Sequence, residues 1–78
     1  MKVTVIGKEY ISGTSKKTGR PFEANLVHVS YKKNGVEGQA VEGIFLDPNT
    51  YPLSDIQVGK VYNVDRDNRG YLVAFDLA

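Results

Sequence analysis

The 78-residue chain contains no cysteine, only one histidine and no long apolar run. Without cysteine it can form neither a disulfide framework nor a zinc–thiolate site. His28 has no neighbouring metal ligands, and the serines and threonines lack a histidine–acid partner set, so we expect no catalysis. The acids Asp65, Asp67 and Asp76 fit no calcium-loop spacing, so we expect no metal site either. The chain is therefore predicted to be a non-enzymatic domain without a cofactor.

Membrane-spanning and secretory segments are also missing from the sequence. No stretch approaches the roughly 18 consecutive apolar residues that a membrane-spanning helix needs. The first residues, which include Lys2 and Lys8, are too polar and their apolar run is too short for a signal peptide. We expect a soluble protein that works in the cytoplasm.

Net charge is close to zero, but the charges are unevenly distributed. The whole chain carries +1, whereas residues 12–22 carry +3 from Lys16, Lys17 and Arg20 with no acid among them. Residues 34–57 contain four acids and no lysine or arginine, which gives −4. A nearly neutral protein can still bind nucleic acid through a local basic segment, although less tightly than a strongly basic protein.

The alternation of apolar residues and the turn signals between them predict five β-strands and no long helix. Gly7 interrupts the first strand and indicates a β-bulge. The connection between the third and fourth strands carries two prolines, and Ser54 could cap a single helical turn there. A tight turn is expected at residues 67–70. The predicted strands are residues 2–11, 22–33, 36–46, 60–66 and 71–77.

Asn34–Gly35 is a strong signal for a two-residue type I′ hairpin between the second and third strands. That turn fixes a register between the two strands. The pairs it predicts are Lys32 with Glu37, His28 with Val41 and Ala24 with Phe45.

Five strands with their longest connection between the third and fourth match the order of an OB-like fold. The second strand is apolar on both faces, which suits a coiled strand in a small closed barrel. We therefore predict an all-β, five-stranded OB-like antiparallel barrel that occupies residues 1–78 as a single domain. An SH3-like barrel has a similar strand count and stays open as the alternative.

Residues 13–22, here called the basic loop, are the candidate binding segment. Gly13 and Gly19 permit a tight loop, and Pro21 biases Arg20 toward an extended backbone. Phe22 follows and opens directly into the second strand. Cations would meet phosphates and the ring would stack on a base, as in single-stranded nucleic-acid binding. A solvated loop whose Phe22 begins the core is the competing interpretation.

The basic loop, Gly-Thr-Ser-Lys-Lys-Thr-Gly-Arg-Pro-Phe, resembles the binding wing of the single-stranded-DNA-binding proteins of filamentous bacteriophages. Ile-Phe-Leu-Asp at residues 44–47 resembles the end of that family's third strand. Residues 58–64 resemble its Gly-x-Tyr-x-Val entry to the fourth strand, with one extra residue, and residues 72–76 its last strand. The resemblance covers nearly the whole chain in the same order.

The resemblance implies an OB fold with a protruding binding hairpin, a homodimer, and cooperative, largely sequence-independent coating of single-stranded DNA. It implies a phage or prophage protein acting in DNA replication in the cytoplasm of a bacterial host. Lys16 or Lys17 and Arg20 take the phosphate-contacting positions, and Phe22 takes that of the stacking tyrosine. Whether the protein prefers DNA or RNA stays open.

The sequence departs from the family at two places. Gln39 and Ala40 stand where the family has a second exposed tyrosine, and the long loop between the last two strands is cut to residues 67–70. The position of a second stacking aromatic and the mode of dimerisation are therefore not implied. Further candidates are aromatic residues beside cations at the predicted turns, namely Tyr31, Lys32, Lys33, Arg69 and Tyr71.

A second function class fits the same composition. A small barrel could bind a protein partner through the acidic segment at residues 34–57, while the basic loop would serve only solubility. Titration with oligo(dT) at low salt distinguishes the two hypotheses.

Overall fold

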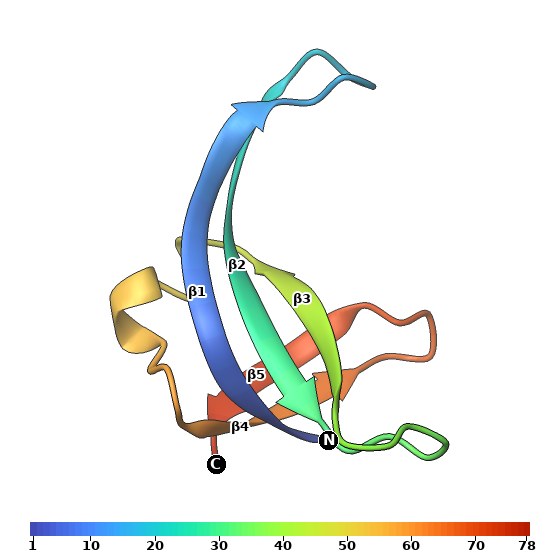
Figure 1. Ribbon diagram of the computed structural model, residues 1–78. Coiled ribbons are helices and arrows are strands. Elements are labelled where there is room, and N and C mark those ends of the chain that lie inside the picture. Colours follow the sequence, from blue (N-terminus) through green and yellow to red (C-terminus); the bar gives the residue numbers. More distant parts are fainter.

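The computed structural model describes residues 1–78 and contains one antiparallel sheet of five strands with a single short 3₁₀ turn, η1 (Figure 1). The all-β prediction with five strands is confirmed. No helix has the length and apolar character needed to cross a membrane. The strands follow the sheet order β3-β2-β1-β4-β5. The elements are β1 (Lys2–Thr14), β2 (Pro21–Tyr31), β3 (Ala40–Leu46), η1 (Leu53–Asp55), β4 (Val61–Arg66) and β5 (Leu72–Leu77).

The sheet does not close, so the predicted barrel is not confirmed. β3 and β5 are both edge strands, and no backbone ladder joins them. One side-chain hydrogen bond joins β3 to the β4–β5 hairpin across the opening: Arg66 Nη2 donates to Glu42 Oε1 at 2.7 Å. A single exposed ion pair is worth about 0–1 kcal/mol, so it cannot replace a strand ladder.

β1 is long and bends because of a β-bulge. Val5 pairs with Val29 and Gly7 with His28, which leaves Ile6 as the extra residue. The predicted interruption at Gly7 is therefore confirmed, and Figure 1 shows the curvature of β1. The bend divides β1 between two neighbours: residues 2–4 pair with β4, Val5 still exchanges backbone hydrogen bonds with Gly59 and Lys60, and beyond the bulge β1 pairs only with β2. A bulge is a common way to turn one strand from one partner to another.

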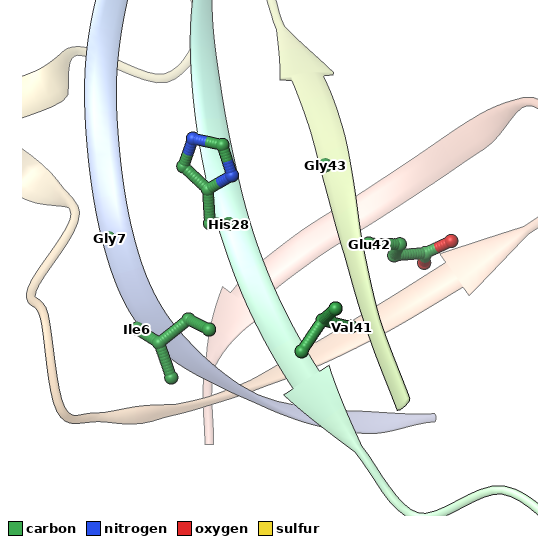
Figure 2. A pocket seen from close by; sticks show the side chains of 6 residues that line it. All are labelled: Ile6, Gly7, His28, Val41, Glu42 and Gly43. Carbon is green, nitrogen blue, oxygen red and sulfur yellow. The ribbon is translucent and has the colours of Figure 1, made fainter. Parts of the chain in front are cut away.

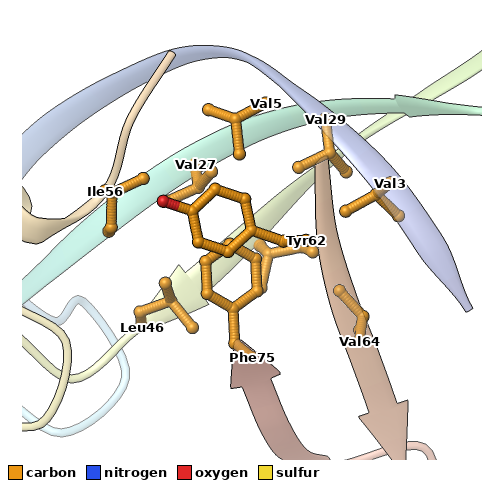
Figure 3. Packing of buried hydrophobic residues seen from close by; sticks show 10 residues of the cluster. Val3, Val5, Val27, Val29, Leu46, Ile56, Tyr62, Val64 and Phe75 are labelled. Atoms are coloured by element: carbon orange, nitrogen blue, oxygen red, sulfur yellow. The ribbon is translucent and has the colours of Figure 1, made fainter. Parts of the chain in front are cut away.

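The core lies between the bent β1–β2–β3 layer and the β4–β5 hairpin (Figure 3). The rings of Tyr62 and Phe75 stack with centroids 4.7 Å apart and planes inclined by 11°. Branched aliphatic side chains from β1 and β2 cover them, which suits a twisted sheet surface. The ten buried hydrophobic residues are Val3, Val5, Val27, Val29, Ile44, Leu46, Ile56, Tyr62, Val64 and Phe75.

The connection between β3 and β4 packs beside β1 through polar contacts. Lys8 Nζ donates to the carbonyl oxygens of Leu53 at 2.8 Å and Ile56 at 2.7 Å. The Leu53 carbonyl also accepts the Ile56 N–H at 3.2 Å, so Lys8 adds a second hydrogen bond there and joins β1 to the η1 turn. The predicted helical turn is present, but Ser54 lies inside it; the cap residue is Pro52, which makes no side-chain cap.

The predicted β2–β3 register is wrong by two residues. Leu26 pairs with Phe45 and Ser30 with Val41, and β3 begins at Ala40 rather than at residue 36. A type I′ turn requires positive φ at both central residues, but only Gly35 has it, with φ of 85°. The chain instead makes a longer connection over residues 32–39. A shift of two residues preserves which side chains face the core, so the predicted faces survive the error.

Candidate nucleic-acid interface

The basic loop stands clear of the rest of the sheet (Figure 1). β1 and β2 pair as far as Thr14 and Pro21, whereas β3 reaches only Asn25 along β2. The turn at residues 15–20 is closed by Ser15 N–H donating to the Arg20 carbonyl at 2.9 Å. The outer end of the hairpin is therefore open to solvent on both faces. The protruding position that the sequence predicted agrees with this arrangement.

The three cations of the basic loop are exposed and unpaired. Lys16, Lys17 and Arg20 take part in neither of the chain's two ion pairs, which are His28–Glu9 and Arg66–Glu42. Unpaired cations on a narrow protrusion create a local positive potential despite a nearly neutral total charge. Arg20 precedes β2, so strand alternation does not fix the direction of its side chain.

The nearest acid, Glu23, is engaged on the other face of the hairpin. Tyr10 donates its hydroxyl to Glu23 Oε2 at 2.6 Å. That hydrogen bond to the carboxylate, together with partial desolvation, raises the pKa of Tyr10 above its ordinary value. Tyr10 pairs with buried Asn25 across the strands and so shares the core-facing side of the sheet.

Phe22 lies on the opposite face, here called the outer face, and does not join the core. Its cross-strand partner is Gly13, and a Cβ on that glycine would lie 3.5 Å from the Phe22 ring. The ring therefore rests on the glycine backbone with 46% of the residue exposed. A half-exposed aromatic ring at the base of a cationic loop offers a surface on which a base could stack.

The candidates at the far end of β2 are separated from the basic loop. Tyr31 is half-buried and packs against the core, so it is the weakest of the predicted stacking residues. Lys32 and Lys33 are exposed in the β2–β3 connection. β2 has 11 residues, which at about 3.3 Å per residue puts roughly 35 Å between its ends. An oligonucleotide would need about ten stacked nucleotides, at about 3.4 Å each, to reach from one end to the other.

Arg69 and Tyr71 lie at the β4–β5 hairpin, where the predicted tight turn is confirmed. Gly70 N–H donates to the Asp67 carbonyl at 3.0 Å, and Gly70 has φ of 85°. Asp67 Oδ1 accepts from the backbone N–H groups of Arg69 at 2.9 Å and Tyr71 at 3.0 Å. The Arg69 guanidinium carbon lies 5.7 Å from the Tyr71 ring centroid, within range of a cation–π contact. Tyr71 itself is 66% exposed.

Phe45 is an exposed aromatic that the sequence interpretation did not select. It lies on the outer face of β3 and is 64% exposed, whereas its neighbours Ile44 and Leu46 are buried. Strand alternation could have identified it from the sequence. If Ile44 and Leu46 both face the core, then Phe45 between them must face outward. Phe45 and Tyr71 line the same groove between β3 and β5, whose volume is about 350 Å³.

The outer face also carries a shallow hollow of about 460 Å³ beside the β1 bulge (Figure 2). His28 rises over Gly7, and its Nε2 lies 3.3 Å from Glu9 Oε1. No group of three or more histidine, aspartate or glutamate side chains is close enough to hold a metal ion. The hollow contains no lysine or arginine; its lining residues are Ile6, Gly7, His28, Val41, Glu42 and Gly43.

Comparison of the chain with models of protein families, with curated proteins and with solved structures found no match. The resemblance of the basic loop and strand ends to the phage proteins therefore stays a hypothesis drawn from the sequence.

Proposed function

We propose that the protein binds single-stranded DNA without sequence preference and performs no chemistry on it. The observation that carries this proposal is the exposed, unpaired cation set of Lys16, Lys17 and Arg20 beside the half-exposed ring of Phe22. The cations neutralise phosphates, and the ring offers a stacking surface that any base can use. Duplex DNA would not expose base faces to Phe22, so single strands are the favoured substrate.

The biological setting follows from the sequence resemblance and is part of the same proposal. The protein would coat phage or prophage DNA during replication in the bacterial cytoplasm, with RNA as an alternative ligand. The open sheet would be a variant of the OB-like fold in which β3 and β5 stay apart. Five strands, a bent β1 shared between two neighbours, and a long β3–β4 connection support that assignment.

A homodimer belongs to this proposal as well. Only 12 of the 78 residues are buried, and domains of this size commonly gain stability by association. Both edge strands, β3 and β5, also present unpaired backbone groups. Dimerisation would let two basic loops bind one DNA strand, which increases the effective concentration of the second loop.

Salt-dependent titration with oligo(dT) tests the proposal. If about three to five cations per subunit meet phosphates, log affinity should fall with log salt at a slope of about −2 to −3.5. The double variant Lys16→Ala/Lys17→Ala should flatten the slope by about 1–1.5, since each cation contributes about 0.7 on single strands. The matched control is Lys32→Ala/Lys33→Ala, which removes the same charge at the other end of β2. An unchanged salt slope in Lys16→Ala/Lys17→Ala would exclude the basic loop as the binding site.

A second candidate function is binding of a protein partner. The hollow beside the β1 bulge favours it, because exposed Ile6 and Val41 line a surface without lysine or arginine. The acidic segment at residues 34–57 supports it less, since Glu42 is paired with Arg66 and Asp47 accepts from its own turn. Failure of the wild-type protein to bind oligo(dT) at low salt would favour this candidate.

A further inference from the structure

The groove between the two edge strands carries two aromatic rings that are largely exposed to solvent. Phe45 projects from β3 and Tyr71 from the β4–β5 turn, and about two thirds of each residue is exposed. The groove has a volume of about 350 Å³ and is open to solvent. Large exposed rings that line one groove indicate a binding surface rather than a structural role.

Hydrogen bonds hold the Tyr71 side of the groove in place. The Asp67 carboxylate accepts the backbone N–H of Tyr71, and the Asp67 N–H donates to the Tyr71 carbonyl at 2.9 Å. The backbone of Tyr71 is thus fixed at both its donor and its acceptor, while the Arg69 guanidinium lies near its ring. A ring on a fixed backbone loses little conformational freedom when a ligand stacks on it.

The charge around the groove suits a polyanion. Arg69 is free of any ion pair, and the only carboxylate among the lining residues, Glu42, is neutralised by Arg66. Arg69 is not itself a lining residue, but its guanidinium lies near the Tyr71 ring, and the lining contains no unpaired acid. Phosphates near Arg69 and bases against the rings would satisfy both features.

The groove is also continuous with the proposed binding surface of the basic loop. Phe45 pairs with Leu26, and Leu26 lies on the outer face four residues along β2 from Phe22. A Cβ on Gly43 would lie 3.0 Å from Leu26 Cδ1, so Leu26 covers the glycine at the edge of the groove. Four residues span about 13 Å, which about four stacked nucleotides cover at about 3.4 Å each.

We propose that Phe45 and Tyr71 form a second base-stacking site in the same subunit, occupied by the strand that the basic loop holds. This inference rests on the proposed function and adds to it. The second site would need no aromatic residue from a partner subunit. The bound DNA strand would run from Phe22 over Leu26 into the groove between β3 and β5.

A tryptophan reporter tests occupancy of the groove directly, because the chain has no tryptophan of its own. Phe45→Trp should lose emission on addition of (dT)12, since stacking against bases quenches indole fluorescence. The matched control is Val58→Trp, an exposed position in the β3–β4 connection that does not line the groove. Its emission should stay unchanged while the protein binds the same oligonucleotide.

Affinity provides the second measurement. Phe45→Ala and Tyr71→Ala should each weaken (dT)12 binding by about 5- to 150-fold with an unchanged salt slope, as expected for loss of one stacked base. Tyr71→Phe keeps the ring and should bind normally. Melting temperatures confirm that each variant is folded.

The outcomes separate this inference from the proposed function. If wild type binds (dT)12 but Phe45→Trp emission does not change and Phe45→Ala binds normally, the groove is not a stacking site and the basic loop remains one. If wild type binds no oligonucleotide, both proposals fail. If Phe45→Trp emission changes with protein concentration alone, the groove is a contact between copies of the chain and the stacking proposal is wrong.

Discussion

Replacement of Phe22 by alanine distinguishes a binding residue from a core residue. A buried phenylalanine costs about 3–5 kcal/mol of folding free energy when truncated to alanine, because a cavity remains. Phe22 is 46% exposed and rests on the backbone of Gly13, so no enclosed cavity can form. Full burial of such a side chain is worth about 1.5–3 kcal/mol, and about half of that is lost here. We therefore expect Phe22→Ala to reduce the free energy of unfolding by about 1 kcal/mol.

Two assays measure the consequences of that substitution. For a domain of this size, 1 kcal/mol lowers the melting temperature by about 4–8 °C. The loss of one stacked base should weaken oligonucleotide binding by about 1–3 kcal/mol, similarly for dT, dA and dC. Phe22→Tyr should retain both properties, whereas Phe22→Leu should retain most of the packing on Gly13 and lose the stacking.

Tyr10→Ala is the matched control, because Tyr10 lies on the same hairpin with similar exposure but on the opposite face. It should lower stability by a similar amount and leave binding nearly unchanged. A loss of 3–5 kcal/mol in Phe22→Ala stability together with normal binding would refute the assignment of Phe22 to the binding surface. Equal binding losses for Phe22→Ala and Tyr10→Ala would show that hairpin stability, not stacking, controls affinity.

The remaining predictions concern the core, pH and assembly. Asn25 is buried and donates to the Tyr51 carbonyl at 2.7 Å. Asn25→Ala should therefore lower the free energy of unfolding, measured with denaturant, by about 1–3 kcal/mol. Asn63 is exposed, and Asn63→Ala should lower it by less than about 0.5 kcal/mol. The folded-state pKa of Tyr10 is raised by its hydrogen bond to Glu23. This contact should therefore stabilise the protein below the unfolded pKa of 10.0 and lose its effect as pH rises through the folded pKa. A stability difference between wild type and Tyr10→Phe that grows at alkaline pH would contradict this. Sedimentation at tens of micromolar should show a homodimer, and a monomer both with and without oligonucleotide would refute that assignment.

Local sequence signals predicted the elements of this protein well, because each depends on neighbouring residues. Alternating apolar residues placed all five strands within a few positions, and Gly7 correctly marked the bulge. The turn at residues 67–70 followed from Asp67 and Gly70, whose side chain and backbone conformation act within the turn itself. The exposed cations of the basic loop could also be predicted, since no acid lies among them.

Properties that depend on distant residues needed the tertiary structure. Asn34–Gly35 gave a false type I′ signal, because the length of the β2–β3 connection is decided by how β3 packs and not by the turn alone. Closure of the sheet depends on the distance between β3 and β5, and no local pattern encodes that distance. The structure alone brought Phe45 and Tyr71, 26 positions apart in the sequence, to one groove. The sequence by itself thus determined the strands and the basic loop, whereas the packing of β3 against the β4–β5 hairpin brought Phe45 and Tyr71 to one groove.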